Sequence, residues 1–264
     1  MNEYLEAIIL GIVQGITEFL PISSDGHLEL SKWILGDNHS AADSFMMTII
    51  LHFGTMFAII WVFRKMILDL LKNLNTPEGR KFVLLVVISM IPAVIVGVGF
   101  ESFMTTFFSG KIVFVGLMLM INGVLLLSSD YFPKSNQPIT PMRSLLIGIA
   151  QAIAILPGIS RSGSTITTSL ALGIDRKQAA NFSFLIVVPL LLGKMAKDIL
   201  SGDLIMSQSK ALPLVVGFLC SLIVGIFACE LVLKVVLKGK LRYFGIYCLI
   251  VGAVAIAVKL WIFK

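Results

Sequence analysis

Long apolar runs recur along this chain, and they constrain its fold more than any other feature. A helix that spans a bilayer needs about 20 consecutive, mostly apolar residues. Six runs approach or exceed that length, at 44–63, 82–100, 112–127, 179–197, 211–233 and 243–263. We therefore expect an all-α, polytopic membrane protein with six transmembrane helices.

The composition agrees with a membrane protein and excludes several other classes. Hydrophobic residues make up 57% of the chain and charged residues 14%, whereas soluble domains have about 45–50% and about 25%. This excludes a soluble enzyme, a disordered chain and a disulfide scaffold. The net charge of +6 comes from short basic clusters between apolar runs, as in loops next to membrane helices, and not from a nucleic-acid-binding face.

Two further apolar regions, 7–35 and 145–174, are interrupted by polar residues and by proline. The first contains Glu18, Pro21 and His27, and the second contains Pro157 and Arg161. Each has an apolar arm too short to cross a bilayer, then a polar turn and a second short arm. Such broken backbone is tolerated at membrane depth only where protein or a water-filled cavity surrounds it. We expect both regions to be re-entrant helical hairpins.

The two broken regions resemble each other. The stretch GIVQGI at 11–16 parallels GIAQAI at 148–153, and LPISSDG at 20–26 parallels LPGISRSG at 156–163. Each half would contain one hairpin and three spans, and an odd number of spans makes the second copy insert upside down. We expect one membrane domain over 1–264, with repeat one at about 1–130 and repeat two at about 140–264. Coincidence within Gly- and Ile-rich sequence is the alternative explanation.

The densest basic loop sets the expected orientation. It contains Arg64, Lys65, Lys72, Arg80 and Lys81, and cytoplasmic loops are enriched in such residues. If this loop is cytoplasmic, successive loops lie on alternate sides of the membrane. Most Lys and Arg residues are then on the cytoplasmic side, and both termini are outside.

Ionisable residues within a membrane are costly and are functional candidates by default. Gln14 and Glu18 are one turn apart and share a helix face. Pro21 ends that arm, and Ser24 and His27 share a face if a helix restarts in the turn after Ser23.

The second broken region has the chemistry of an anion site. Gly158 and Gly163 allow backbone amides to approach a ligand closely, and a helix N-terminus favours negative charge. Arg161 can bind two phosphate oxygens at once. Further hydroxyl donors are supplied by Ser160, Ser162, Ser164 and Thr165.

Together the two hairpins suit phosphoryl transfer, with a cradle for phosphoryl oxygens, a carboxylate for a divalent ion and a nucleophile or general acid/base. Structural alternatives stay open for each part. Glu18 and Arg161 form a buried structural bridge in one of them, and His27 serves only as a hydrogen-bonded core residue in another. His52, on an otherwise apolar run, is interpreted as structural. We interpret Ser164, Thr167 and Thr168 as capping and packing residues.

At these residues the sequence resembles the undecaprenyl-diphosphate phosphatase family of bacterial inner membranes, the bacitracin-resistance type. The stretch LGIVQGITEFLPISSDGH at 10–27 is similar to its first signature, and LPGISRSGST at 156–165 to its second. The resemblance covers essentially the whole chain.

The resemblance implies hydrolysis of a C55 polyprenyl diphosphate to the monophosphate at the outer face of the membrane. This reaction recycles the lipid carrier for peptidoglycan and confers bacitracin resistance. A divalent cation, Mg or Ca, is implied, with Glu18 and Gln14 as its candidate ligands. The implied catalytic residues are Glu18, Ser24, His27 and Arg161. The implied substrate-binding residues are Gln14, Ser23, Ser160, Ser162 and Thr165.

Two positions depart from the family pattern. Gln14 replaces an acid found in many members, and Asp25 stands where Ser or Thr is commoner and either adds an acid near the site or faces solvent. The nucleophile is Ser24 assisted by His27, which we favour, or His27 itself, or a water. A polyprenyl-phosphate flippase and a purely structural membrane scaffold are the rival functions. The oligomeric state is left open, with a homodimer as one possibility.

Overall fold

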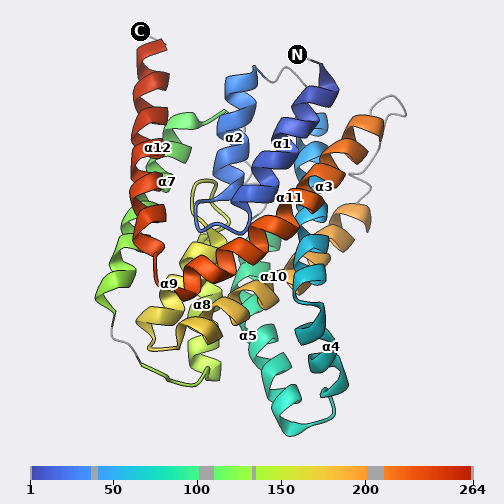
Figure 1. Ribbon diagram of the computed structural model, residues 1–264, viewed down its shortest axis with the longest axis vertical. Coiled ribbons are helices and arrows are strands. Elements are labelled where there is room, and N and C mark those ends of the chain that lie inside the picture. The colour runs from blue at the N-terminus through green and yellow to red at the C-terminus, as the bar shows by residue number, and fades with distance from the viewer. Residues whose placement is uncertain (1, 37–40, 101–109, 133–134, 201–210, 263–264) are drawn as a thin grey trace.

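A computed structural model describes the chain except for residues 1, 37–40, 101–109, 133–134, 201–210 and 263–264 (Figure 1). Every regular element in the described ranges is a helix. The helices are α1 (Glu3–Thr17), α2 (Ser24–Leu35), α3 (Ala41–Val62), α4 (Arg64–Lys72), α5 (Pro77–Gly99), α7 (Ile112–Ser128), the 3-10 turn η1 (Ser129–Tyr131), α8 (Pro141–Ile153), α9 (Arg161–Ala171), α10 (Arg176–Leu200), α11 (Ala211–Leu237) and α12 (Leu241–Ile262).

The first broken region is a pair of short helices, α1 and α2, joined by a turn over 18–23. α1 begins after Asn2, whose side chain accepts a hydrogen bond from the Tyr4 amide at 3.0 Å. α2 begins after Ser23, which caps it through the Gly26 amide at 3.3 Å. It ends at Gly36, whose φ of 67° is a left-handed conformation that glycine adopts without strain.

The second broken region repeats this construction with α8 and α9. Thr140 caps α8 through the Arg143 amide, and Ser160 caps α9 through the Gly163 amide at 3.1 Å. α9 starts 137 residues after α2, the same offset that relates the two sequence motifs. Both predicted interruptions are therefore present, each as a helix, a turn and a second helix.

Five helices in the described part of the chain are long and apolar enough to cross a membrane. They cover Asp43–Val62, Pro77–Gly99, Ile112–Tyr131, Ala211–Val236 and Leu241–Trp261. This confirms five of the six predicted runs. The sixth, 179–197, lies within α10, a 25-residue helix that is not among the five. Several side chains near the C-terminal end of α10 lie outside the described residues, so the span expected at 179–197 stays a prediction.

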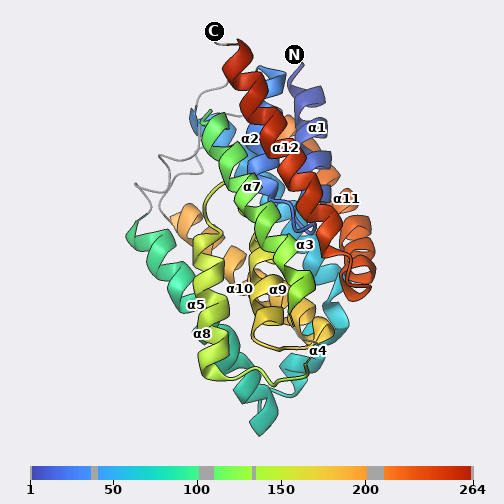
Figure 2. The ribbon, with the colours of Figure 1, turned by 90° about the vertical axis from the view of Figure 1, so that its left-hand side faces the viewer.

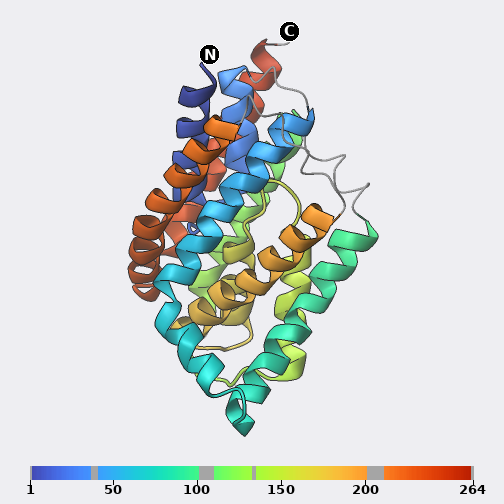
Figure 3. The ribbon, with the colours of Figure 1, turned by 90° about the vertical axis from the view of Figure 1, so that its right-hand side faces the viewer.

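Close pairs of long helices hold the hairpins in place. α12 packs along α7, α11 packs between α1 and α3, and α8 packs along α5 (Figure 2). α7 and α12 touch at their backbones, where a Cβ added to Gly123 would lie 2.7 Å from the Gly245 carbonyl oxygen. On the opposite side, α10 crosses between α3 and α5 (Figure 3). The largest apolar cluster joins α3, α9, α10 and α11.

The two hairpins approach from opposite ends of the molecule. α1 and α2 occupy the end where both termini lie, and α8 and α9 occupy the other half (Figure 1). α2 and α9 therefore point away from each other, and their N-terminal ends meet near the middle. The turns touch closely, since a Cβ added to Gly26 would lie 3.0 Å from Gly158 Cα.

Candidate functional site

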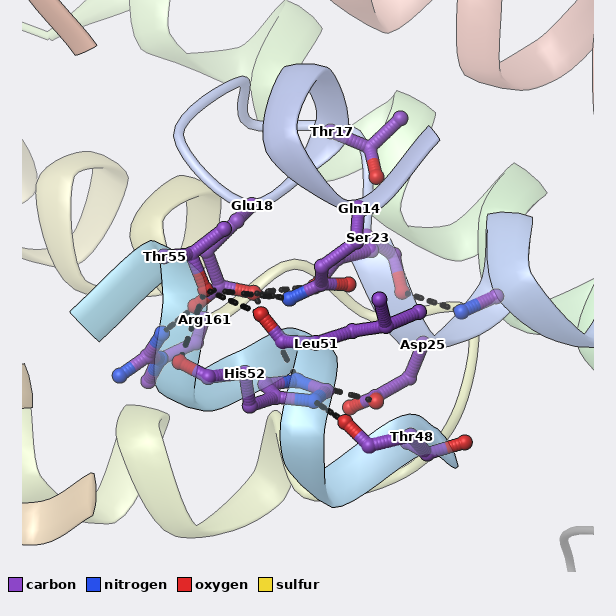
Figure 4. A network of polar contacts seen from close by, with 12 residues as sticks. Gln14, Thr17, Glu18, Ser23, Asp25, Thr48, Leu51, His52, Thr55 and Arg161 are labelled. Carbon is purple, nitrogen blue, oxygen red and sulfur yellow. Dashed lines mark hydrogen bonds and ion pairs between the residues drawn. The ribbon is translucent and has the colours of Figure 1, made fainter. Parts of the chain in front are cut away.

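Glu18 lies at the centre of a polar network in the middle of the molecule (Figure 4). It follows α1 directly, and its side chain is only 2% exposed. Glu18 Oε2 accepts a hydrogen bond from Ser24 Oγ at 2.6 Å and another from Gln14 Nε2 at 3.0 Å. Glu18 Oε1 accepts one from Arg161 Nη2, which comes from the second hairpin. The buried carboxylate thus joins the two hairpins.

Two buried polar atoms beside Glu18 have no hydrogen-bond partner in the described part of the chain. Gln14 turns its Nε2 toward Glu18, with a longer contact of 3.4 Å to Thr55 Oγ1, and its Oε1 is left over. Arg161 uses Nη2 on Glu18, and its Nη1 is left over. A buried polar group without a partner costs about 1–3 kcal/mol. Gln14 thus has an unused oxygen acceptor, the kind of atom that binds a cation, and Arg161 has an unused guanidinium donor, the kind of group that binds an anion.

Two helix N-termini converge at this network. Ser24 is the first residue of α2, and Arg161 is the first residue of α9. The free amides and the dipole of a helix N-terminus attract anions. Across the turn, the Gly158 amide donates to Ser23 Oγ at 3.0 Å, so the two turns are tied together directly. The arrangement places a serine hydroxyl and an arginine at one anion-attracting point.

The other hydroxyls predicted to bind substrate have partners within the protein. Ser160 Oγ caps α9 and lies 3.2 Å from Ser162 Oγ. Thr165 Oγ1 donates to the Arg161 carbonyl at 2.8 Å. These side chains and that of Ser23 are each at most 7% exposed. They hold the turns in shape, and their role in binding substrate stays a prediction.

Asn122 of α7 is a positioning residue that sequence reasoning missed. Its Nδ2 donates to the Pro21 carbonyl at 3.0 Å, and its Oδ1 accepts from the Ser160 amide at 3.0 Å. The side chain is fully buried. It therefore bridges the turn of the first hairpin to the turn of the second.

His27 does not contact Ser24 as the favoured interpretation of the sequence required. Its Nδ1 lies 2.8 Å from the Ser23 carbonyl oxygen, and its Nε2 lies 2.9 Å from Tyr247 Oη on α12. The group hydrogen-bonded to Ser24 is Glu18 instead. The spacing of Ser24 and His27 correctly suggested a restarted helix, but at the first turn of α2 the two side chains have different partners.

His52 and Asp25 belong to the network, although His52 was interpreted as structural. His52 Nε2 lies 3.6 Å from Glu18 Oε2 and 3.5 Å from Asp25 Oδ1. Its Nδ1 donates to the Thr48 carbonyl at 2.8 Å, which fixes the ring (Figure 4). The sequence left open whether Asp25 adds an acid near the site or faces solvent. Its side chain lies at the edge of the network and is 33% exposed.

A signal for His52 was present in the sequence. Thr48, His52 and Thr55 are spaced by four and three residues, so they form one polar stripe on the otherwise apolar α3. Thr55 contacts Gln14, and His52 contacts Glu18. A polar stripe on a membrane helix indicates a buried polar partner, whereas each residue taken alone resembles an ordinary core position.

Comparison with known proteins identifies the family. The model of the family described as bacitracin resistance protein BacA matches residues 7–254. A protein of Christiangramia forsetii named undecaprenyl-diphosphatase is 46% identical over 257 residues, covering 96% of this chain and 97% of its own. Proteins of the same name from Bacteroides thetaiotaomicron and Korarchaeum cryptofilum are 39% and 37% identical and cover 97% and 95% of this chain, and 99% and 97% of their own. The chain, a helical membrane protein in which a serine and an arginine meet a buried glutamate, therefore belongs to the BacA family.

Proposed function

We propose that this protein hydrolyses undecaprenyl diphosphate to undecaprenyl phosphate and inorganic phosphate. One observation carries the proposal. Ser24 Oγ donates to the buried carboxylate of Glu18 at 2.6 Å, beside an arginine whose second terminal nitrogen has no hydrogen-bond partner among the residues that the structure describes. A hydroxyl with an adjacent base and an anion-binding guanidinium are the groups that phosphoryl transfer through a serine requires. The substrate is inferred from the relatives, which are named undecaprenyl-diphosphatases.

In the proposed reaction Ser24 Oγ attacks the terminal phosphorus while Glu18 Oε2 takes up the hydroxyl proton. The bond between phosphorus and the bridging oxygen breaks, and its electron pair leaves with undecaprenyl phosphate, which receives the proton from Glu18. Water then attacks the phosphoserine and gives a proton to Glu18. The Ser24 oxygen leaves and recovers that proton, which returns the enzyme to its starting state.

Arg161 stabilises the charge of the transferred group in this scheme. Its Nη2 orients the Glu18 carboxylate, and its buried Nη1 is available to a phosphoryl oxygen. The dipoles at the N-termini of α2 and α9 act in the same direction. The structural bridge between Glu18 and Arg161 is therefore present, and it leaves half of the guanidinium for substrate. The alternatives with His27 as nucleophile or as activator of a water have less support, because both His27 ring nitrogens already have partners.

A divalent cation, Mg or Ca, is proposed to bind at the same place. Gln14 Oε1 is a buried oxygen without a hydrogen-bond partner among the described residues, and the Glu18 carboxylate is one turn away. No group of three or more His, Cys, Asp or Glu residues able to hold a metal is found in the described ranges. Magnesium is commonly held by one or two protein oxygens together with phosphate oxygens and water, so Glu18 and Gln14 would hold it with the diphosphate. When bound, the ion would neutralise charge on the phosphoryl oxygens.

The proposed placement in the membrane has six spans, with α10 as the sixth, and two re-entrant hairpins related by an inverted repeat. The basic segment around α4 and the start of α5 lies at the end opposite to both termini (Figure 1). With that segment in the cytoplasm, the α1–α2 hairpin opens to the outer face of the bacterial inner membrane. There the enzyme would recycle the lipid carrier for peptidoglycan synthesis and cell shape, and confer bacitracin resistance. A homodimer is part of the proposal.

Phosphate release from a prenyl diphosphate by purified protein in detergent tests the reaction. We expect release in the parent, its loss with a chelator, and a decrease of at least about 10²-fold in Ser24→Ala and Glu18→Gln, the scale of losing one acid/base or charge-stabilising group. Ser128→Ala, at the end of α7, is the matched control because its hydroxyl donates to the Leu125 carbonyl of its own helix.

A substrate labelled on its terminal phosphate separates the alternatives. Label on Ser24 after an acid quench would support the serine route, and turnover by Ser24→Ala near the parent rate would contradict it. Detergent abolishes any transmembrane gradient, so folded parent protein without phosphate release would favour a lipid flippase and contradict the enzyme.

A further inference from the structure

The imidazole of His27 is occupied on both sides. A carbonyl oxygen only accepts hydrogen bonds, so the nitrogen 2.8 Å from the Ser23 carbonyl, Nδ1, carries the proton. In the neutral ring Nε2 then accepts from Tyr247 Oη at 2.9 Å. The two rings are nearly parallel, with centroids 5.6 Å apart and planes 10° apart. Neither nitrogen is directed at Glu18 or Ser24.

The backbone that His27 holds is strained. Ser23 has φ of 71°, and it is the only residue other than glycine with a positive φ in the described part of the chain. Such conformations persist when surrounding contacts over-determine them, and they concentrate at functional sites. The Ser23 carbonyl accepts from the His27 amide at 3.1 Å as well as from Nδ1. His27 therefore supplies two of the contacts that keep Ser23 in this conformation.

The conformation of Ser23 has a consequence for the second hairpin. It places Ser23 Oγ where the Gly158 amide donates to it at 3.0 Å. Gly158 has φ of 106° and leads into the short turn before Arg161. A continuous set of contacts thus runs from Tyr247 on α12 through His27 and Ser23 to Gly158.

We propose that His27 and Tyr247 are positioning residues that hold the Ser23 turn against Gly158 and thereby align Arg161 with Glu18. In this role His27 neither attacks phosphorus nor transfers a proton. Tyr247 fixes the ring plane so that Nδ1 reaches the Ser23 carbonyl. The proposal rests on the phosphatase activity proposed above, but the contacts that it invokes exist without substrate.

Substitutions of His27 separate positioning from proton transfer. Asparagine places an amide nitrogen close to the position of Nδ1, and it has no useful acid/base chemistry near neutral pH. We expect His27→Asn to keep kcat/KM within about tenfold of the parent and His27→Ala to lose at least about 10²-fold, the usual cost of displacing a charge-stabilising group. Equal losses in His27→Asn and His27→Ala would overturn the proposal, because a general acid/base would be lost in both.

Tyr247→Phe tests the hydrogen bond between Tyr247 Oη and His27 Nε2. Its matched control is Tyr243→Phe, one turn earlier on α12. Tyr243 contacts Arg242 and lies away from the site. We expect Tyr247→Phe to lower kcat several-fold in the parent, to leave the pH profile of kcat unchanged, and to have no further effect in His27→Asn, where Nε2 is absent. An equal effect in both backgrounds would contradict the coupling.

Hydrogen exchange provides a readout that does not depend on activity. We expect the peptide containing the Gly158 amide to lose protection in His27→Ala and Tyr247→Phe, and to keep it in His27→Asn and Tyr243→Phe. Unchanged protection in folded His27→Ala would overturn the proposal. A parent protein that releases no phosphate would instead contradict the proposed function, while the exchange comparison would still decide whether this pair positions the turn.

Discussion

Arg161 and Glu18 are separated by 143 residues in sequence and form a partly buried ion pair that joins the two hairpins. Each belongs to a hairpin that would be incomplete alone, since one supplies the carboxylate and the hydroxyl and the other supplies the cation. The site therefore depends on contacts that hold two turns in register, namely Ser23 to Gly158 and the bridge made by Asn122.

Arg161→Lys should abolish most of the activity while preserving the charge. Lysine is a point charge and lacks the planar fork that contacts Glu18 and phosphate at the same time. We expect kcat/KM to fall by at least about 10²-fold with KM raised, because substrate binding and charge stabilisation are both lost. Phosphate release at several substrate concentrations measures kcat and KM separately. A lysine variant with parental kinetics would contradict the role of the fork.

Gln14→Glu should strengthen binding of the divalent cation. The variant replaces the unpartnered amide oxygen beside Glu18 with a carboxylate, a better ligand for Mg or Ca. We expect the cation concentration giving half-maximal activity to fall several-fold, with tighter binding of Mn²⁺ followed by electron paramagnetic resonance. An unchanged Mn²⁺ affinity would show that Gln14 does not face the ion.

His52 and Asp25 should act as a pair at the edge of the site. Their side chains are 3.5 Å apart, and His52 is 3.6 Å from Glu18. We expect His52→Ala and Asp25→Ala each to lower kcat/KM by about tenfold, and the double variant to lose little more, because residues in one network are not additive. Fully additive losses would show that they act independently. Phosphate release by the four proteins of the cycle is the measurement.

Gly123→Ala should destabilise the fold through the contact of α7 with α12. The added Cβ would lie 2.7 Å from the Gly245 carbonyl oxygen, so the two backbones must separate. Overpacking of this kind costs about 1–3 kcal/mol, which thermal unfolding in detergent would detect as a lower Tm. The matched control is Gly97→Ala, where the nearest described atom to an added Cβ is Ile155 Cδ1 at 3.8 Å, an ordinary van der Waals contact. Equal Tm values for the two variants would contradict the prediction.

The sequence predicted the fold well where hydropathy and turn chemistry act locally. Five apolar runs and both helix–turn–helix interruptions were predicted because length, proline and capping residues determine them along a single segment. The sixth run, 179–197, lies within α10, and because several side chains near the C-terminal end of α10 lie outside the described residues, its role as a sixth span stays a prediction.

The site was predicted in part. Gln14, Glu18 and Arg161 stood out because ionisable or strongly polar groups are rare in apolar runs. The partner of Ser24 was not predictable, since the choice between Glu18 and His27 depends on where the turn places each side chain. His27 binds Tyr247, 220 residues away, and no local pattern indicates such a contact. Asn122 was missed for the same reason, because its partners Pro21 and Ser160 lie in turns far from it in sequence. His52 was missed because it was considered alone, although the stripe that it forms with Thr48 and Thr55 on α3 indicated a buried polar partner.

Ser24 and Arg161 occupy equivalent places, each the first residue of the second helix in its hairpin. In one copy that place holds the proposed nucleophile, and in the other it holds the group that anchors the phosphate. The two broken regions share one construction, a helix, a turn and a second helix, yet the roles proposed for them differ, with the attacking group in one and the phosphate-binding group in the other. Each chain accordingly has one reaction centre despite its two hairpins, and labelling of the serine should saturate at one phosphate per chain.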